Sequence, residues 1–177
     1  MDSNEQARRA YLGLDPSVEK SLNLGFAGFN AATSANIPDQ MAVGTETGTL
    51  VIGGQVDQGS SANKQMRLTV GMTKYSDGPF DVDSNHDQYD ITYATDTAAL
   101  PALTLSLKNI PTGSLTGTLM GTYHLTGDIV GDVVLSLTIT GTMADGGGGT
   151  VTRAPGSTTI TGTATQGDGV YNVNVTL

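Results

Sequence analysis

Apolar and polar residues alternate along most of the chain after residue 41. Leu135, Leu137 and Ile139, for example, alternate with Ser136, Thr138 and Thr140, although Val134 is an exception to the pattern. Successive side chains of a strand point to opposite faces, so this pattern predicts strands that are buried on one face and exposed on the other. Half-buried strands are typical of antiparallel sheets. The sequence predicts eight or nine strands, at 43–57, 64–76, 88–95, 102–109, 114–126, 129–143, 149–154, 157–166 and 169–177.

A helical pattern precedes the strands. Apolar residues recur at spacings of four, four and three, which is one helix face: Val18, Leu22, Phe26 and Phe29. Asp15 is expected to cap this helix, and Pro16 suits its first turn. We therefore expect a helix over about 16–33, with a short polar helix before it at roughly residues 4–12. Because few charges follow Lys20, the longer helix should be covered nearly all round.

Together these elements predict an all-β fold: an antiparallel barrel or barrel-like sandwich of about 8–9 strands, with the helix packed in or across its interior. Glycines interrupt the apolar faces of two predicted strands, at Gly117, Gly121 and Gly162. A missing side chain on such a face indicates that something bulky approaches the backbone. Our hypothesis is that Leu22, Phe26 and Phe29 pack there and line an apolar cavity. The alternative is that the glycines mark bends and bulges of a strongly coiled sheet.

Length and charge narrow the class of protein. A chain of 177 residues predicts one domain, which we place at 15–177, after a polar tether and short helix at 1–14. The net charge is -9 and only eight lysines and arginines are present, so no nucleic-acid partner is expected. No apolar run approaches the roughly 20 residues that a membrane-spanning helix needs.

Several strings of residues, in this order, resemble a family of uncharacterised predicted lipoproteins from gliding, predatory Gram-negative bacteria. They are Tyr11-Leu12-Gly13-Leu14-Asp15, Leu24-Gly25-Phe26-Ala27-Gly28-Phe29-Asn30, Ser34-Ala35-Asn36-Ile37-Pro38, Gly54-Gln55-Val56-Asp57-Gln58-Gly59 and the segment 154–164. The resemblance covers most of the chain and implies no particular activity or site residue. It implies export to the cell envelope or surface, with membrane attachment only through an N-terminal lipid anchor. The sequence contains no cysteine to carry such an anchor.

One acidic segment has the alternating oxygen groups of a calcium loop: Asp81, Asp83, Asn85 and Asp87. His86 stands where such loops have glycine, and Thr92 stands where they have a bidentate glutamate. The segment is therefore either a weak calcium site or an acidic, solvated hairpin tip. Calcium is the only cofactor that the sequence suggests.

No set of titratable residues in the sequence suggests catalysis. His86 and His124 lack the neighbours of a metal or catalytic site, so we expect no enzymatic activity. Thr-x-Thr units could order water or ice, but they follow no constant period. The leading hypothesis is a non-enzymatic, extracytoplasmic binding module for an apolar or lipid-like ligand. The alternative is a structural surface or coat subunit that associates with itself through sheet edges.

Overall fold

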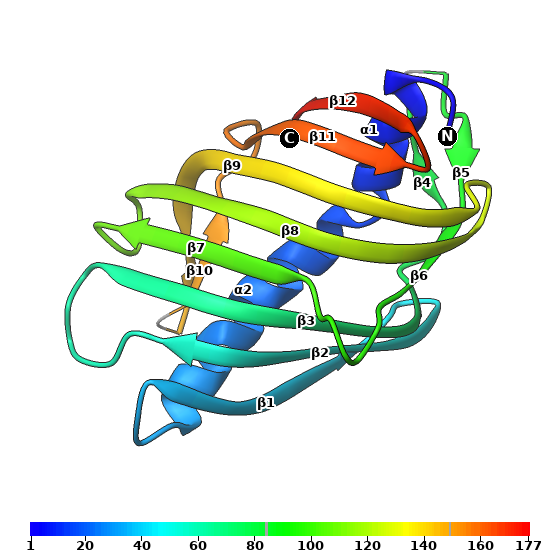
Figure 1. The fold of residues 1–177 in the computed structure, drawn as a ribbon. Coiled ribbons are helices and arrows are strands. Elements are labelled where there is room, and N and C mark those ends of the chain that lie inside the picture. Colours follow the sequence, from blue (N-terminus) through cyan, green and yellow to red (C-terminus); the bar gives the residue numbers. More distant parts are fainter. Residues whose placement is uncertain (84, 149) are drawn as a thin grey trace.

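Most of the chain forms one large antiparallel sheet that curves round a long helix (Figure 1). This computed structural model describes residues 1–83, 85–148 and 150–177. The helices are α1 (Asn4–Leu12) and α2 (Asp15–Ala31). The strands of the large sheet are β1 (Asn36–Val43), β2 (Thr47–Val56), β3 (Lys64–Ser76), β6 (Ile91–Ala94), β7 (Ala102–Lys108), β8 (Ser114–Gly127), β9 (Gly131–Gly147), β10 (Thr150–Arg153), β11 (Thr159–Gln166) and β12 (Gly169–Thr176). A separate hairpin joins β4 (Phe80–Asp81) to β5 (Gln88–Tyr89).

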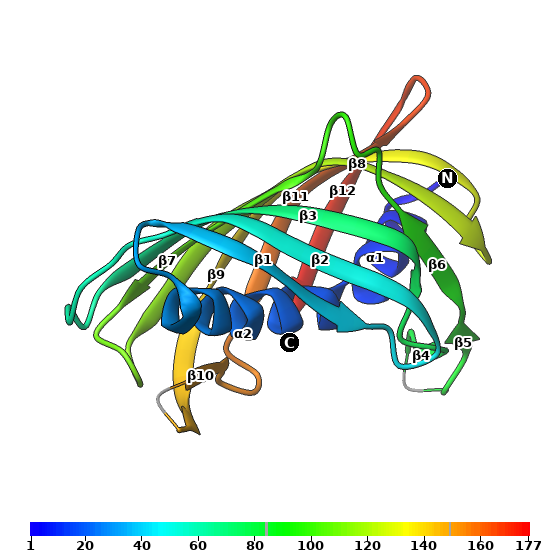
Figure 2. The same ribbon diagram turned by 90° about the horizontal axis from the view of Figure 1, so that it is seen from below.

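The expectation of an antiparallel barrel or barrel-like sandwich is confirmed only as one large antiparallel sheet, which is not a clear closed barrel. Its order is β1-β2-β3, then β7 and β6, which lie end to end between β3 and β8, then β8-β9-β11-β12, with β10 paired to the end of β9. In the described part of the chain, β1 and β12 form the two edges and do not pair with each other. The sheet instead arches over α2 (Figure 2). The helices occupy the concave side near the two edges, since α2 contacts β1 and α1 contacts β12.

The predicted helix face is confirmed as part of the core. Val18, Leu22 and Phe26 are at most 3% exposed, and they belong to one hydrophobic cluster with the concave face of the sheet. Phe29 is half-buried, and the Lys64 ammonium lies 4.0 Å from the centre of its ring. The expectation that α2 is covered all round is wrong, because the side of the helix that carries Asn23, Ala27 and Asn30 is exposed.

Close approach between α2 and the sheet depends on glycines of the helix, not of the strands. A Cβ added at Gly25 would lie 2.7 Å from Met66 Sδ, and one at Gly28 would lie 2.7 Å from Ile37 Cδ1. A side chain at either position would therefore force Met66 or Ile37 to move. The sequence pattern indicated glycines of the strands at this contact, whereas the glycines that lie in it belong to α2.

The three strand glycines of the cavity hypothesis lie against neighbouring strands. The atoms nearest to an added Cβ belong to Thr104 and Leu105 at Gly117, and to Pro101 at Gly121. At Gly162 the Cβ would overlap the Ser136 carbonyl oxygen. Gly121 and Gly162 also have φ of +148° and +146°, which side chains rarely allow. These contacts favour the alternative, in which the glycines permit bends of a coiled sheet.

Residues 1–14 form part of the domain rather than a free tether. The Ser3 hydroxyl caps α1 by accepting a hydrogen bond from the Gln6 backbone N–H. Ala7, Ala10 and Tyr11 face the core and are at most 1% exposed. The first turn of α1 also contacts the edge strand β12. No helix in the described part of the chain is long and apolar enough to cross a membrane.

Rows of hydroxyl side chains run across the convex face of the sheet. One row follows the strand register through Ser106, Thr116, Thr140, Thr159 and Thr176. The next row runs through Thr104, Thr118, Thr138 and Thr161. These residues alternate with buried ones, as the sequence predicted. The rows follow the curvature of the sheet (Figure 2), so they form a solvated face rather than the flat array that ordered ice requires.

Candidate functional site

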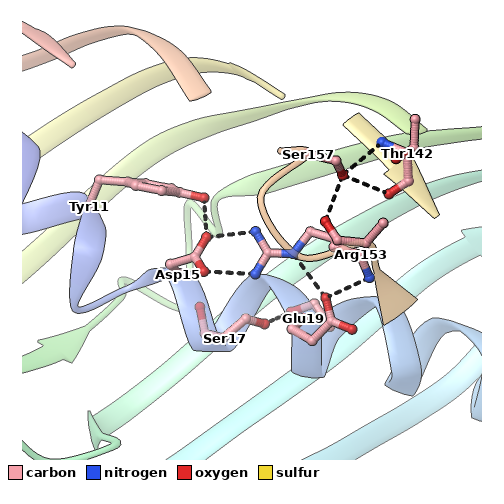
Figure 3. A network of polar contacts seen from close by, with 9 residues as sticks. Tyr11, Asp15, Ser17, Glu19, Thr142, Arg153 and Ser157 are labelled. Atoms are coloured by element: carbon pink, nitrogen blue, oxygen red, sulfur yellow. Dashed lines mark hydrogen bonds and ion pairs between the residues drawn. The ribbon is translucent and has the colours of Figure 1, made fainter. Parts of the chain in front are cut away.

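A small open hollow lies between α2, the end of β10 and the last residue of the chain. Its volume is about 230 Å3. The residues that line it come from three segments far apart in the sequence: Glu19, Arg153, Ala154, Pro155, Thr158 and Leu177. Figure 3 shows the network of polar contacts at this hollow.

Local folding explains how these residues meet. Asp15 and Glu19 are one helical turn apart, so their carboxylates lie on the same face of α2. Arg153 is the last residue of β10, which is held in place because it pairs with Met143 of β9. The chain then leaves β10 through a tight turn, in which the Ser157 hydroxyl donates a hydrogen bond to the Ala154 carbonyl oxygen at 2.7 Å.

Arg153 joins the strand to the helix through two carboxylates (Figure 3). Its two terminal nitrogens donate to the two oxygens of Asp15, both at 2.7 Å, which is the bidentate geometry of strong guanidinium–carboxylate pairs. Its Nε donates to Glu19 Oε2 at 2.9 Å. The Tyr11 hydroxyl donates to Asp15 Oδ1 at 2.6 Å. Asp15 therefore holds Arg153 and Tyr11 and does not cap α2, whose N-cap residue is Leu14 without a side-chain hydrogen bond.

Burial makes these charges depend on one another. Side-chain exposure is 12% for Arg153, 13% for Asp15 and 26% for Glu19. Burial alone would lower the pKa of Arg153, but hydrogen bonds to Asp15 and Glu19 outweigh burial and hold that pKa above its ordinary value. Burial also raises the pKa of the Tyr11 hydroxyl, and the charge of Asp15 raises it further. The network thus contains two carboxylates and one guanidinium, a net charge of -1.

Two polar atoms of the lining residues have no partner. Three buried side-chain oxygens in the described residues lack a hydrogen bond, and two of them, Glu19 Oε1 and Thr158 Oγ1, belong to this hollow. Thr158 is 1% exposed, and its backbone N–H and carbonyl are both bonded to Leu177. Buried polar atoms are nearly always hydrogen-bonded in folded proteins. Both oxygens are themselves buried, so they lie behind the accessible surface of the hollow.

Of the predicted calcium ligands, Asp81 is the last residue of β4, and Asp83, Asn85 and Asp87 lie in the turn between β4 and β5. Asp81 Oδ2 lies 2.9 Å from His86 Nδ1, and this hydrogen bond lowers the pKa of Asp81 and raises that of His86. Asp83 Oδ1 accepts a hydrogen bond from the Asn85 backbone N–H at 2.9 Å. Ser84 lies outside the described residues. Among the residues on either side of it, no three acidic or histidine side chains are grouped to hold a metal ion. Calcium binding stays a prediction.

The predicted apolar site at Leu22, Phe26 and Phe29 is filled by direct packing. Leu22 and Phe26 are 1% and 3% exposed within the hydrophobic cluster of the sheet. Gly25, between them, brings α2 close to Met66. A lipid-like ligand at this place stays a prediction, and its entry would require α2 to move away from the sheet.

The sequence pattern missed the network under β10. Arg153 and its partners are 134 and 138 residues apart, and no local spacing connects them. One signal was present: Arg153 is the only lysine or arginine after Lys108. Arg153 is thus a lone cation in a long Thr- and Gly-rich segment. Asp15 and Glu19, one turn apart in the predicted helix, are acidic residues with which it could pair.

Comparisons of the chain with models of known protein families, with curated proteins and with solved structures find no match. Function is therefore inferred from the residues and their geometry.

Proposed function

We propose that this protein is a non-enzymatic binding module that holds a small polar ligand in the hollow between Glu19, Arg153 and Thr158. The observation that carries the proposal is the hollow of about 230 Å3 in which the ion pair of Glu19 and Arg153 lies beside the apolar surface of Ala154, Pro155 and Leu177.

Binding is favoured over catalysis because the charged groups of the site are committed to one another. Arg153 uses three of its nitrogens on Asp15 and Glu19, and Tyr11 donates to Asp15. A general acid or base needs a group that is free to reach the reacting atom. We propose that the module is located in the cell envelope or at the cell surface. Only the resemblance of the sequence to predicted lipoproteins supports this location.

Thermal unfolding in the presence of small polar compounds tests the proposal. The probes are n-propylammonium, propionate, n-propanol and glucose, each added to wild type and to Thr158→Val. A ligand present at 100 times its dissociation constant stabilises a protein by about 2.7 kcal/mol, which corresponds to roughly 5–10 °C for a chain of this length. At least one probe should raise the Tm of wild type and raise that of Thr158→Val much less. Equal shifts in both proteins, or no shift with any probe, would refute the proposal.

Self-association through β1 is a second candidate function. In the described sheet β1 pairs only with β2, and it carries Met41 and Val43, which are 66% and 67% exposed. An apolar edge strand with unpaired backbone groups favours pairing with another copy. The bulge between Ile37 and Gln40 and the bond from Lys20 to the Val43 carbonyl oxygen limit the free edge to a few residues.

Sedimentation velocity over a range of concentrations tests this candidate. If β1 is the interface, wild type should dimerise and Met41→Lys should stay monomeric, since a charge on an edge strand opposes pairing. Val170→Lys, a matched change at an exposed valine of the opposite edge strand, should leave the dimer intact. A wild type that is monomeric at every concentration would rule out the candidate.

A further inference from the structure

We infer that a second hollow, on the convex face of the sheet over β6, binds the phosphate group of a small organic phosphate. The hollow over β6 has a volume of about 370 Å3 and shares no residue with the hollow under β10. It lies where β3, β6 and β8 meet, and the side chains that line it are those of Thr47, Lys74, Thr92, Ala94, His124 and Thr126. The inference is therefore independent of the proposed function.

A bulge in β3 brings the Lys74 side chain to this hollow. Exposed and buried residues alternate along the start of β3, but Thr73 and Lys74 are both exposed. Lys74 has a φ of +46°, which residues with a side chain rarely adopt, and the pairing of β3 with β2 changes register beside it. A Cβ at Gly48 would lie 2.0 Å from the Lys74 carbonyl oxygen, so the bulge requires glycine there. Bulges redirect side chains and are frequent beside functional sites.

His124 is oriented by the strand on its other side. Its Nδ1 lies 2.6 Å from Oδ1 of Asp132, its cross-strand partner on β9. An ionised carboxylate only accepts hydrogen bonds, so Nδ1 carries a proton and Nε2 is the ring nitrogen left for a ligand. The cross-strand partner of His124 on β6 is Ala94, whose small side chain leaves room beside the ring. The Nε2–H of the protonated ring can donate to an anion bound there.

The charge of the hollow over β6 favours an anion. Five of the eight lysines and arginines form ion pairs among the described residues, and Lys74 is one of the three that do not. None of the described residues that line the hollow is acidic. The hollow is thus a positive site in a chain with a net charge of -9. An ammonium group forms its strong hydrogen bonds with carboxylate or phosphate oxygens.

The donors of the lining match a phosphate group better than a carboxylate. A phosphate monoester has a charge of about -1.5 to -2 and three oxygens that accept hydrogen bonds. Besides Lys74 and His124, the three threonine hydroxyls of the lining can each donate one hydrogen bond. The volume of about 370 Å3 holds roughly 12 non-hydrogen atoms at about 30 Å3 each, which leaves space for a short organic group beside the phosphate. The methyl groups of Ala94 and the threonines provide apolar surface for that group.

An NMR titration of the full chain with glycerol 3-phosphate tests the inference. Glycerol is the neutral comparison and propionate the comparison with a single carboxylate. Glycerol 3-phosphate should shift the ring signals of His124 and the amide signals of Lys74 and Thr126 in a saturable manner, whereas glycerol should not. Propionate should bind about tenfold more weakly or worse, and Lys74→Gln should weaken glycerol 3-phosphate binding by about tenfold or more. Lys108→Gln, at an exposed lysine outside the hollow that also forms no ion pair among the described residues, is the matched control and should bind like wild type.

The other histidine of the chain, His86, is an internal control for unspecific anion binding. Equal shifts of the His86 and His124 signals, or no saturable shift at all, would overturn the inference. Propionate binding as tight as that of glycerol 3-phosphate would overturn the choice of phosphate. Binding that Lys74→Gln leaves unchanged would show that the site lies elsewhere. If Lys74→Gln does not fold, Thr126→Val replaces it and should weaken binding in the same direction.

Discussion

Replacing Arg153 by methionine should strongly destabilise the fold, because it removes the guanidinium that joins β10 to α2. The variant loses three short hydrogen bonds, to Asp15 at 2.7 Å twice and to Glu19 at 2.9 Å. It also leaves two largely buried carboxylates without a cation. Removing one partner of a buried ion pair costs about 3–5 kcal/mol. With a urea m-value of about 2 kcal/mol/M, the unfolding midpoint should fall by roughly 2 M.

Two further variants separate this mechanism from a general loss of packing. Arg67→Met removes the guanidinium of a pair with Asp57 in which both side chains are more than 40% exposed, and it should cost less than about 1 kcal/mol. The triple variant Asp15→Asn, Glu19→Gln, Arg153→Met has no uncompensated charge. It should therefore recover much of the stability that the single variant loses.

The pH dependence gives a second signature. In Arg153→Met, the two largely buried carboxylates carry a charge without a cation for as long as they are ionised. Acid removes this charge, so the deficit in stability relative to wild type should be smaller at pH 4 than at pH 7. Urea unfolding at the two pH values measures it. A loss no larger than that of Arg67→Met, or a deficit that does not change with pH, would refute the reasoning.

Three other variants test the packing and the surface charge of the fold by urea unfolding. Gly25→Ala forces Met66 Sδ to move, which costs about 1–3 kcal/mol, while the higher helix propensity of alanine returns about 1 kcal/mol. The free energy of unfolding should therefore fall by about 0–2 kcal/mol. A rise of about 1 kcal/mol would contradict the close contact. Gly162→Ala should lower the free energy of unfolding by about 2–5 kcal/mol, because the added Cβ would overlap a backbone carbonyl and the residue has a φ of +146°. Thr163→Ala, at the next residue, is the control and should change stability little. The hydrogen bond from Arg8 lowers the pKa of Glu5 to about 2, so the stabilisation by Glu5 is present above pH 4.5 and lost as the pH falls towards 2. Glu5→Gln should therefore cost at most about 1 kcal/mol at pH 6 and nothing near pH 2, whereas an equal cost at both would exclude the ion pair.

Alternation identified the long strands of the sheet because each has one buried and one exposed face. It missed β1, although the segment is eight residues long. β1 contains Pro38 and a register shift between Ile37 and Gln40, so its apolar residues do not recur at every second position. The prediction of one strand at 88–95 also differs from the structure, in which β5 and β6 belong to different sheets.

The remaining features that the sequence pattern did not predict depend on contacts between distant segments. The spacing of Val18, Leu22 and Phe26 gave the buried face of α2, because helical period is a local property. Which glycines touch which strands depends on how α2 crosses the sheet, and sequence spacing contains no information on that. The same holds for Arg153, whose partners were visible only as two acidic residues one turn apart.

Asp15 and Arg153 are 138 positions apart, and this separation determines when their ion pair can form during synthesis on the ribosome. Translation at roughly 5–20 residues per second separates the emergence of the two residues by about 7–28 s. During that interval α2 can rest only on the earliest strands, with its carboxylates still hydrated. The contacts that Arg153 makes to α2 form only after β10 has emerged, so a ribosome that pauses before residue 153 should hold an intermediate that proteases cut readily.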